Sequence, residues 1–373
     1  MTECPDRTGV VGAGVMGRDL AGLLAAAGSS VTLVDVDEAA LDAASEDLAT
    51  RVPDELAAAG YDAPTPLTDA VTTASEYDAL ADAAFVVEAV PDRLGIKQDV
   101  VTALEAVLAP DAVIATNTSS LTAREVGAEA THPERVVLFH FANPAIDRDL
   151  LEIAGERASD DTLVTARAVG EAMDKPPIEL DRERRGNGLS RLSAAIKCSA
   201  SWELPDQNAT AIESAARSLG FAVGPFSLID RIGVDVHLAT VDNLAVDHGD
   251  RFDPPPAVRQ RLEAMVADGR LGAKTGAGFF EWTDGEPVVP EADATGDVEP
   301  ILAALVAEAH RIVADGVADR DRVDVMLRRG SGGPIGPFDV EGMLGADRVR
   351  EVLESRYAET NAPIFDPSVL DDE

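Results

Sequence analysis

The sequence predicts an α/β domain at the N-terminus followed by two related all-α domains. Three observations carry this prediction. Short apolar runs alternate with stretches of helical periodicity over about the first 180 residues. The pattern is mainly helical after that point. A glycine-opened segment then occurs twice, beginning at Gly224 and at Gly336, which is an offset of 112 residues.

The first elements alternate between strand and helix. Residues 8–11 form a short apolar run, and residues 15–27 carry apolar side chains at helical spacing. Gly28 is suited to end that helix, because glycine readily adopts the left-handed conformation found after helix C-termini. Residues 31–34 then predict a second strand, and residues 38–50 predict a second helix.

Three further apolar runs, at 84–87, 112–115 and 135–139, predict buried strands. Their near-continuous apolar character is typical of parallel strands that are covered on both faces. Helical stretches lie between them, so we expect a doubly wound sheet in a domain of residues 1–182.

The helical part divides in two. Residues 183–283 are mostly helical with Gly and Pro breaks, and residues 284–298 are turn-rich and acidic, which predicts a linker. Residues 299–373 are helical again. GPFSLIDRIGVD at 224–235 aligns with GPFDVEGMLGAD at 336–347, so we expect two copies of one helical unit, the second degenerate.

The composition excludes several classes of function. The 68 acidic and 31 basic residues give a formal charge of −37, which repels nucleic acid and anionic lipid. We expect no membrane span, because no apolar run reaches about 18 residues, and we find no signal-peptide pattern. Two cysteines without zinc spacing favour a reduced, cytoplasmic protein with no metal site. The charge and the scarcity of lysine together favour adaptation to a salt-rich cytoplasm.

A glycine motif predicts a dinucleotide site. Gly12-Ala13-Gly14-Val15-Met16-Gly17 fits G-x-G-x-x-G and lies between a predicted strand and a predicted helix. The first glycine permits a tight turn, the second a close pyrophosphate, and the third close packing of helix on strand. The helix N-terminus would then face the phosphates.

An acidic residue at the end of the second strand selects the cofactor. Asp35 can accept both ribose hydroxyls of NAD and would repel the 2′-phosphate of NADP, and Asp37 adds to that repulsion. The alternative is a glycine turn in another kind of α/β protein.

Several segments together resemble one protein family, although no single motif among them would be specific. They are GVVGAGVMG, VVEAVPDRLGIK, TNTSSL, HFANP, LLEI, SLGFAVGPFSLIDRIGVD and KTGAGFFEW. In this order the sequence resembles the L-3-hydroxyacyl-CoA dehydrogenases of fatty-acid β-oxidation over about three quarters of the chain. The resemblance implies a Rossmann-like NAD-binding domain and NAD-dependent oxidation of (S)-3-hydroxyacyl-CoA to 3-ketoacyl-CoA.

The resemblance also implies roles for single residues. His140 would be the general base that removes the proton of the 3-hydroxyl, and Glu152 would orient it. Ser119 would hydrogen-bond the substrate oxygen near the nicotinamide. The remaining implied contacts are to NAD at Asp92, Lys97, Asn117, Ser119 and Lys274, and to substrate at Asn143 and Ser190.

The chemistry is reasonable without the family name. Oxidation of a secondary alcohol needs a base that titrates near neutral pH, which imidazole does, and a hydride acceptor, which NAD supplies. Two alternatives stay open at this point. His140 could be a core histidine satisfied by backbone groups, and Ser119 could merely cap the following helix.

The segment 181–192, DRERRGNGLSRL, departs from the family pattern. The family usually has Asp-x-Pro-Gly-Phe and then Asn-Arg-Leu here, and Ser190 replaces the asparagine that reaches the substrate oxygen. Serine is shorter and offers one donor rather than two. Two rival functions therefore stay open: dehydrogenation of another 3-hydroxy acid or thioester, and a non-catalytic nucleotide-binding subunit of a β-oxidation assembly.

The same segment carries a cluster of cations in a chain that has few. Arg182, Arg184, Arg185 and Arg191 either hold the phosphates of CoA or form a solvated loop that pairs with the acidic surface. Arg51, after the second predicted strand, is another candidate for a CoA contact.

The second helical copy bears on assembly. Single-copy members of the family typically dimerise through the helical domain, so a second copy could cover the same surface within one chain. We expect a monomer with an internal pseudo-dimer, with a homodimer as the alternative. No segment resembles an enoyl-CoA hydratase, so we expect that activity, if needed, on another chain.

Overall fold

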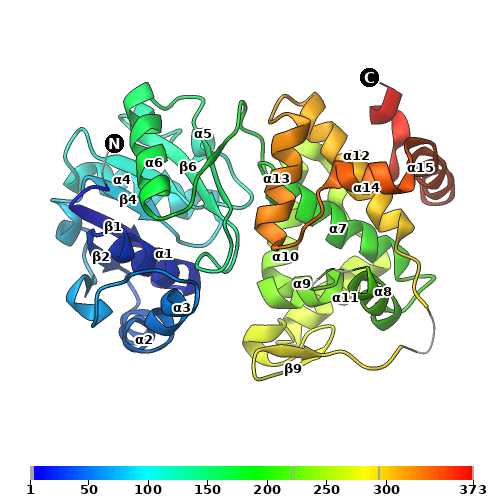
Figure 1. Ribbon diagram of the computed structural model, residues 1–373, viewed down its shortest axis with the longest axis horizontal. Helices are drawn as coiled ribbons and strands as arrows, with labels where there is room; N and C mark the ends of the chain where they lie inside the picture. Colours follow the sequence, from blue (N-terminus) through cyan, green and yellow to red (C-terminus); the bar gives the residue numbers. More distant parts are fainter. Residues whose placement is uncertain (1–3, 220, 222, 293–294, 372–373) are drawn as a thin grey trace. The chain divides into compact units, whose positions relative to one another are not determined.

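The computed structural model describes two compact units (Figure 1). The first comprises residues 1–184 and is α/β, and the second comprises residues 185–373 and is mainly helical. The residues described are 4–219, 221, 223–292 and 295–371.

The first unit is built on a sheet whose strand order, in the part of the chain that is described, is β3-β2-β1-β4-β5-β6-β7-β8. The strands are β1 (Arg7–Val11), β2 (Ser30–Val34), β3 (Val71–Ala74), β4 (Phe85–Glu88), β5 (Val113–Thr116), β6 (Val136–Phe141), β7 (Leu151–Ala154) and β8 (Ile178–Glu179). Neighbouring strands pair in parallel, but β6 and β7 are antiparallel. The order reverses between β1 and β4, and α/β sheets bind ligands at the carboxyl ends of strands beside such a reversal.

The helices of the first unit differ in how they begin. They are α1 (Val15–Ala26), α2 (Glu38–Ala49), α3 (Arg51–Ala58), α4 (Leu94–Val107), α5 (Ala123–Val126) and α6 (Asp160–Ala172). The side chains of Asp37, Thr122 and Ser159 accept N–H groups in the first turns of α2, α5 and α6. Helix α1 has no side-chain cap, and Gly28 follows its C-terminus with a φ of 91°.

One core cluster of the first unit lies between one face of the sheet and the helices α1 and α6, and it also includes residues of α2 and α3 (Figure 1). Leu20 and Leu24 of α1 and Val169 of α6 are fully buried against Val10 of β1 and Phe139 of β6. Strands β4, β5 and β6 are buried at every position, which explains the near-continuous apolar runs in the sequence.

The second unit contains nine α-helices and a hairpin among its described residues. The helices are α7 (Leu189–Glu203), α8 (Ala209–Ser218), α9 (Pro225–Ile232), α10 (Val234–His248), α11 (Pro256–Ala267), α12 (Glu299–Ala314), α13 (Arg320–Ser331), α14 (Pro337–Leu344) and α15 (Ala346–Thr360). The hairpin strands are β9 (Glu281–Thr283) and β10 (Glu286–Val288). Short 3-10 helices occur across both units at Leu67–Asp69, Tyr77–Leu80, Pro133–Arg135, Gly249–Phe252, Ala273–Thr275, Pro363–Phe365 and Pro367–Asp371.

The internal repeat is confirmed by the helices themselves. Helices α9 and α10 recur as α14 and α15, with both ends of each helix offset by 112 residues. Gly233 joins the first pair with a φ of 102°, and Gly345 joins the second with a φ of 88°. These conformations strongly favour glycine, so each repeat keeps a glycine at this corner.

The two repeats share a core through α7 and α12. Ala194 and Cys198 of α7 belong to the same buried cluster as Ala303 and Ala307 of α12 and Leu353 of α15. Alanine at these positions allows the two helix backbones to approach closely. The separate boundaries 183–283 and 299–373 stay a prediction.

Some elements differ from the sequence prediction. The segment 284–298 is not uniformly turn, because β10 begins at residue 286. Asp284 and Gly285 have φ values of 52° and 79°, and Asp-Gly is a strong signal for a tight hairpin. Strands β3, β7 and β8 are additional to the five predicted ones. They are short, and β3 and β7 carry polar side chains that break the apolar runs.

The arginine cluster is resolved in a way that neither interpretation anticipated. Arg191 is fully buried, with its Nε 2.7 Å from Glu308 Oε1 and its Nη1 2.7 Å from Asp315 Oδ2. Arg185 is also buried and donates to the carbonyl of Asn243 at 2.8 Å. For Arg191, both the CoA interpretation and the solvated-loop interpretation are wrong, because packing of α12 on α7 encloses its side chain. For Arg185 the two interpretations stay predictions.

Candidate active site

His140 and Glu152 face each other across two antiparallel strands. His140 lies on β6 and Glu152 on β7, and the strand register places them directly opposite. His140 Nδ1 is 2.7 Å from Glu152 Oε2, and their side chains are 3% and 0% exposed. Directly paired residues project to the same face of a sheet, so the hairpin register brings the two side chains together.

The other ring nitrogen of His140 meets a serine. Ser119 follows β5, and its Oγ lies 3.1 Å from His140 Nε2. With Nδ1–H donated to Glu152, Nε2 is the nitrogen that can accept a proton. His140 is therefore not a core histidine satisfied by backbone. Ser119 is not the cap of the following helix either, since Thr122 caps α5.

The turn that carries Ser119 is held by a carboxylate. Asp92 Oδ2 accepts the backbone N–H of Ser119 at 2.9 Å and that of Ser120 at 3.1 Å, and also accepts the Ser120 hydroxyl at 3.0 Å. Asn117 Oδ1 accepts the N–H of Phe141 at 3.1 Å. This second bond joins the loop after β5 to the end of β6, next to His140.

Lys97 is enclosed among acceptors. Its Nζ lies 2.9 Å and 3.0 Å from the two carboxylate oxygens of Glu88, 3.3 Å from Asp92 Oδ1 and 3.4 Å from the carbonyl of Asn117. Burial opposes its charge, but the carboxylates of Glu88 and Asp92 raise the pKa of Lys97 above its ordinary value. Glu88 was missed from the sequence. The available signal was a carboxylate at the end of an otherwise apolar strand.

The glycine loop has the form that a dinucleotide needs. A Cβ at Gly17 would lie 1.8 Å from the carbonyl oxygen of Gly12, so α1 can approach β1 only with glycine there. A Cβ at Gly14 would meet nothing within 4 Å, which leaves space in front of the loop. Because α1 has no side-chain cap, its first N–H groups are suited to a pyrophosphate.

Asp35 stands at the edge of the same loop. Its Oδ2 accepts the N–H of Ala13 at 2.7 Å, and its Oδ1 accepts that of Asp37 at 3.0 Å. Val15, the first residue of α1, and Val36, next to Asp35, are 56% and 78% exposed, which is unusual for large apolar side chains and suits contact with a nucleotide. These groups fit NAD, which would supply the hydride acceptor.

The other predicted residues are placed as follows. Asn143 is exposed in the loop between β6 and β7. Ser190 and Lys274 belong to the second unit: Ser190 is the second residue of α7, and Lys274 Nζ lies 2.6 Å from Asp235 Oδ1. The structure thus brings Ser119, His140, Glu152, Asp92, Lys97 and Asn117 together within the first unit.

Arg51 has partners within its own unit. Its guanidinium lies 3.0 Å from Asp19, 3.1 Å from Asp47 and 2.5 Å from Glu55. The CoA roles expected for Arg51, Arg182 and Arg184 stay predictions.

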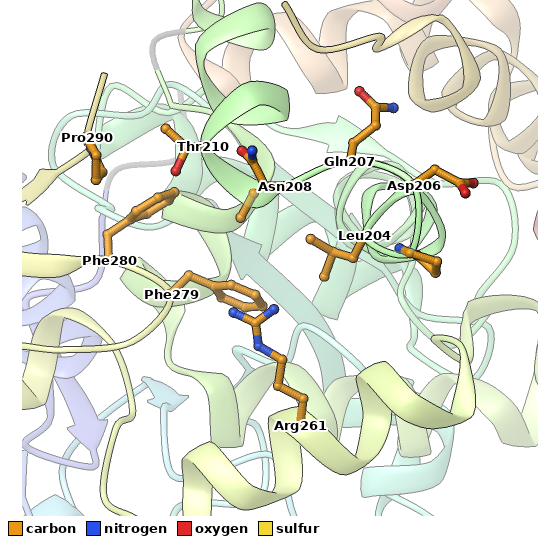
Figure 2. A pocket seen from close by; sticks show the side chains of 11 residues that line it. Leu204, Asp206, Gln207, Asn208, Thr210, Arg261, Phe279, Phe280 and Pro290 are labelled. Atoms are coloured by element: carbon orange, nitrogen blue, oxygen red, sulfur yellow. The ribbon is translucent and has the colours of Figure 1, made fainter. Parts of the chain in front are cut away.

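The second unit also has a surface pocket of about 510 Å³ (Figure 2). Arg261 of α11 lies over the ring of Phe279, with its Cζ 5.1 Å from the ring centroid. The lining residues are Leu204, Pro205, Asp206, Gln207, Asn208, Ala209, Thr210, Arg261, Phe279, Phe280 and Pro290. None of the residues predicted from the sequence lines this pocket.

The described residues contain no group of three or more His, Cys, Asp or Glu side chains placed to hold a metal ion. They also contain no helix that is both long and apolar enough to span a membrane.

Comparison with known proteins agrees with the geometry. Residues 7–184 match the model of the 3-hydroxyacyl-CoA dehydrogenase NAD-binding domain. The model of the C-terminal domain of the same family matches residues 189–282 and also residues 298–373.

Three relatives illustrate the range of similarity. The fatty acid oxidation complex subunit alpha of Shewanella sp. strain MR-7 is 30% identical over 322 residues, which are 80% of this chain and 45% of that protein. The chain therefore spans less than half of that relative. A 3-hydroxybutyryl-CoA dehydrogenase structure from Escherichia coli K12 shares the fold with a TM-score of 0.83 at 22% identity, covering 100% of this chain and 98% of its own. The (S)-3-hydroxybutyryl-CoA dehydrogenase structure from Ralstonia eutropha has a TM-score of 0.65 at 25% identity, covering 75% of this chain and 99% of its own.

Because the two family models together match most of the chain, in the order and places that the fold requires, the chain belongs to the 3-hydroxyacyl-CoA dehydrogenase family.

Proposed function

We propose that the chain catalyses the NAD-dependent oxidation of (S)-3-hydroxyacyl-CoA to 3-ketoacyl-CoA. One observation carries the proposal above all others. Ser119, His140 and Glu152 form a hydrogen-bonded series of side chains at the carboxyl ends of β5 and β6. The sheet lies in a domain that matches the NAD-binding domain of the family.

We propose a step for each of these side chains. His140 Nε2 accepts the proton of the 3-hydroxyl as the C–H hydride leaves. Glu152, 2.7 Å from Nδ1, holds the ring in the required tautomer and stabilises the imidazolium that forms. Ser119 bonds Nε2 here, and when substrate is present its hydroxyl can donate to the substrate oxygen instead. Bound NAD supplies the hydride acceptor.

The cofactor preference follows from Asp35. A carboxylate at the end of β2 accepts ribose hydroxyls and repels a 2′-phosphate. Asp37, whose carboxylate caps α2, adds a second negative charge close by. We therefore expect NAD and not NADP to be the working cofactor.

A second candidate function concerns the substrate. Ser190 stands in the first turn of α7, where the family pattern has asparagine. A shorter side chain with one donor would hold the substrate oxygen less firmly. Another 3-hydroxy acid or thioester is therefore the second candidate substrate.

We also propose that the chain works as a monomer. The shared core of α7 and α12 supports this, because the second repeat covers a face of the first within the chain. The Ralstonia eutropha structure, by comparison, aligns over 99% of its own length with only 75% of this chain. Enoyl-CoA hydration, if it accompanies this reaction, would be supplied by a partner chain.

The net charge supports the proposal that the protein functions in a salt-rich cytoplasm. A net charge of −37 on 373 residues produces self-repulsion that dissolved salt screens. The 31 cations offset less than half of the 68 acidic residues, even where they pair with carboxylates, as Arg259 does with Asp242 and Asp253.

A substrate panel tests the proposal. Acetoacetyl-CoA and free acetoacetate would each be offered with NADH and with NADPH, in roughly 2–4 M KCl to screen the acidic surface, and absorbance would be followed at 340 nm. We expect turnover of the thioester with NADH. Turnover of acetoacetate alone would favour the second candidate. No turnover of either, with NADH still bound, would overturn the proposal.

A further inference from the structure

A fully buried ion pair lies beneath the site and has no part in the steps above. Glu88 is the last residue of β4, and Lys97 is in the first turns of α4. Their side chains are both 0% exposed, with Nζ 2.9 Å from Oε1 and 3.0 Å from Oε2. Burying two charges carries a large desolvation cost, and a fixed arrangement of the pair is one reason to retain it.

Glu88 ties three segments together. Its Oε1 accepts the N–H of Val90 at 2.7 Å, in the turn after β4. Its Oε2 accepts the hydroxyl of Thr116 at 2.7 Å, at the end of β5. Lys97, on α4, donates to both oxygens. Thr116 is followed directly by the loop that carries Ser119.

Lys97 connects Glu88 to the same loop. Its Nζ lies 3.4 Å from the carbonyl of Asn117 and 3.3 Å from Asp92 Oδ1. The other oxygen of Asp92 accepts the N–H groups of Ser119 and Ser120. The ammonium group thus holds the beginning of the loop directly and the serine turn through Asp92.

From this geometry we infer that Glu88 is a positioning residue for Ser119, acting through Lys97 and Asp92. The inference rests on the proposed function, because it concerns the serine that meets His140 Nε2 at 3.1 Å. The Lys97 ammonium is enclosed by protein acceptors, and one of them, Asp92, also holds the serine turn. Direct contact of Lys97 with the cofactor is the rival explanation.

Neutralising Glu88 should loosen the serine turn. In Glu88→Gln, the side chain has one oxygen acceptor and one NH₂ donor in place of two oxygen acceptors. The NH₂ group then faces a donor of Val90, Thr116 or Lys97, and no hydrogen bond can form there. Lys97 then keeps Asp92 as its carboxylate partner and is drawn toward it. We expect kcat to fall by roughly 10- to 100-fold, because small misplacements at a reacting centre have effects of that order.

The test measures the surroundings of the His140 ring and the binding of the cofactor separately. For Glu88→Gln we would determine kcat and KM for acetoacetyl-CoA, the NADH dissociation constant by fluorescence, and the ¹⁵N shifts of the His140 ring without substrate. We expect a lower kcat, a changed Nε2 signal and an NADH dissociation constant within about threefold of wild type, less than 1 kcal/mol. Glu88→Gln/Lys97→Met removes both charges and should fold even if the single variant does not, with the low kcat retained.

A matched control is Glu183→Gln. Glu183 is a buried carboxylate of the same unit that accepts the N–H groups of Arg124 and Glu156 and has no bond to the Ser119 loop. It should lose stability while kcat and the His140 signal stay unchanged.

Two results would overturn the inference. One is a tenfold weaker NADH affinity with kcat at saturation unchanged, which would make the ion pair part of the cofactor site. The other is an unchanged kcat together with an unchanged His140 signal. If wild type fails to reduce acetoacetyl-CoA, the proposed function fails, while the His140 spectrum still decides the positioning claim.

Discussion

Lys197 is a buried cation whose replacement should stabilise the second unit. It lies on α7 with only 4% of its surface exposed, beside the fully buried Cys198. No hydrogen bond or ion pair joins its ammonium group to another residue that the structure describes. Burial lowers the pKa of Lys197 from 10.5 to about 8. Lys197→Met keeps a long unbranched side chain and removes the charge.

The size and pH dependence of the effect follow from these two pKa values. Below pH 8 the lysine is charged in both folded and unfolded chains, and the difference between 10.5 and about 8 corresponds to a folding penalty of about 3 kcal/mol. As pH rises from about 8 to 10.5 the folded chain has already released its proton, so the penalty fades. We expect the variant to be about 2–3 kcal/mol more stable at pH 7 and less than about 1 kcal/mol more stable at pH 10.

Urea unfolding followed by circular dichroism, at one KCl concentration and at both pH values, measures this difference. Lys175→Met is the matched control. Lys175 is also buried, but its Nζ donates to the carbonyls of Ile146 and Arg148, so its replacement should destabilise the chain. The reasoning is refuted if Lys197→Met is less stable than wild type at pH 7, or if its advantage is the same at both pH values.

Three further predictions concern the helical unit and the charge. Arg191→Met should lower the free energy of unfolding, measured in urea, by about 3 kcal/mol. This is at the low end for a broken buried pair, because Glu308 keeps Arg251 and Arg311 as partners. An unchanged free energy of unfolding would show that the Arg191–Glu308 pair contributes nothing. Light scattering at high salt should give one chain mass, 39.0 kDa, and twice that mass would contradict the internal pseudo-dimer. Transfer from high KCl to about 0.1 M salt should unfold the chain because screening is lost, and full helical signal in dilute buffer would argue against salt adaptation.

The elements that the sequence predicted well are those with a single strong periodicity. Residues 15–27 and 38–50 were predicted as helices, and α1 and α2 end one residue earlier. The five predicted strands are also present, because buried parallel strands leave short, near-continuous apolar runs. Strand β7 was not recognised, since Glu152 interrupts its apolar run.

The candidate site was predicted in part. His140, Glu152 and Ser119 were named through family resemblance, and the structure places them in contact. Glu88 was not named, because its importance depends on an ammonium group nine residues later that turns back toward it. Arg191 was misinterpreted for a similar reason, since its partner Glu308 is distant in sequence.

The central claim is that His140, paired with Glu152, is the base of a 3-hydroxyacyl-CoA dehydrogenase. The most direct measurement is NADH-dependent reduction of acetoacetyl-CoA by wild type, His140→Ala and His132→Ala at high salt. His132 is exposed, and its ring pairs with the exposed Glu134, so it controls for loss of an imidazole. We predict a loss of roughly 10²- to 10⁴-fold in kcat for His140→Ala alone. Equal activity of all three proteins would contradict the account.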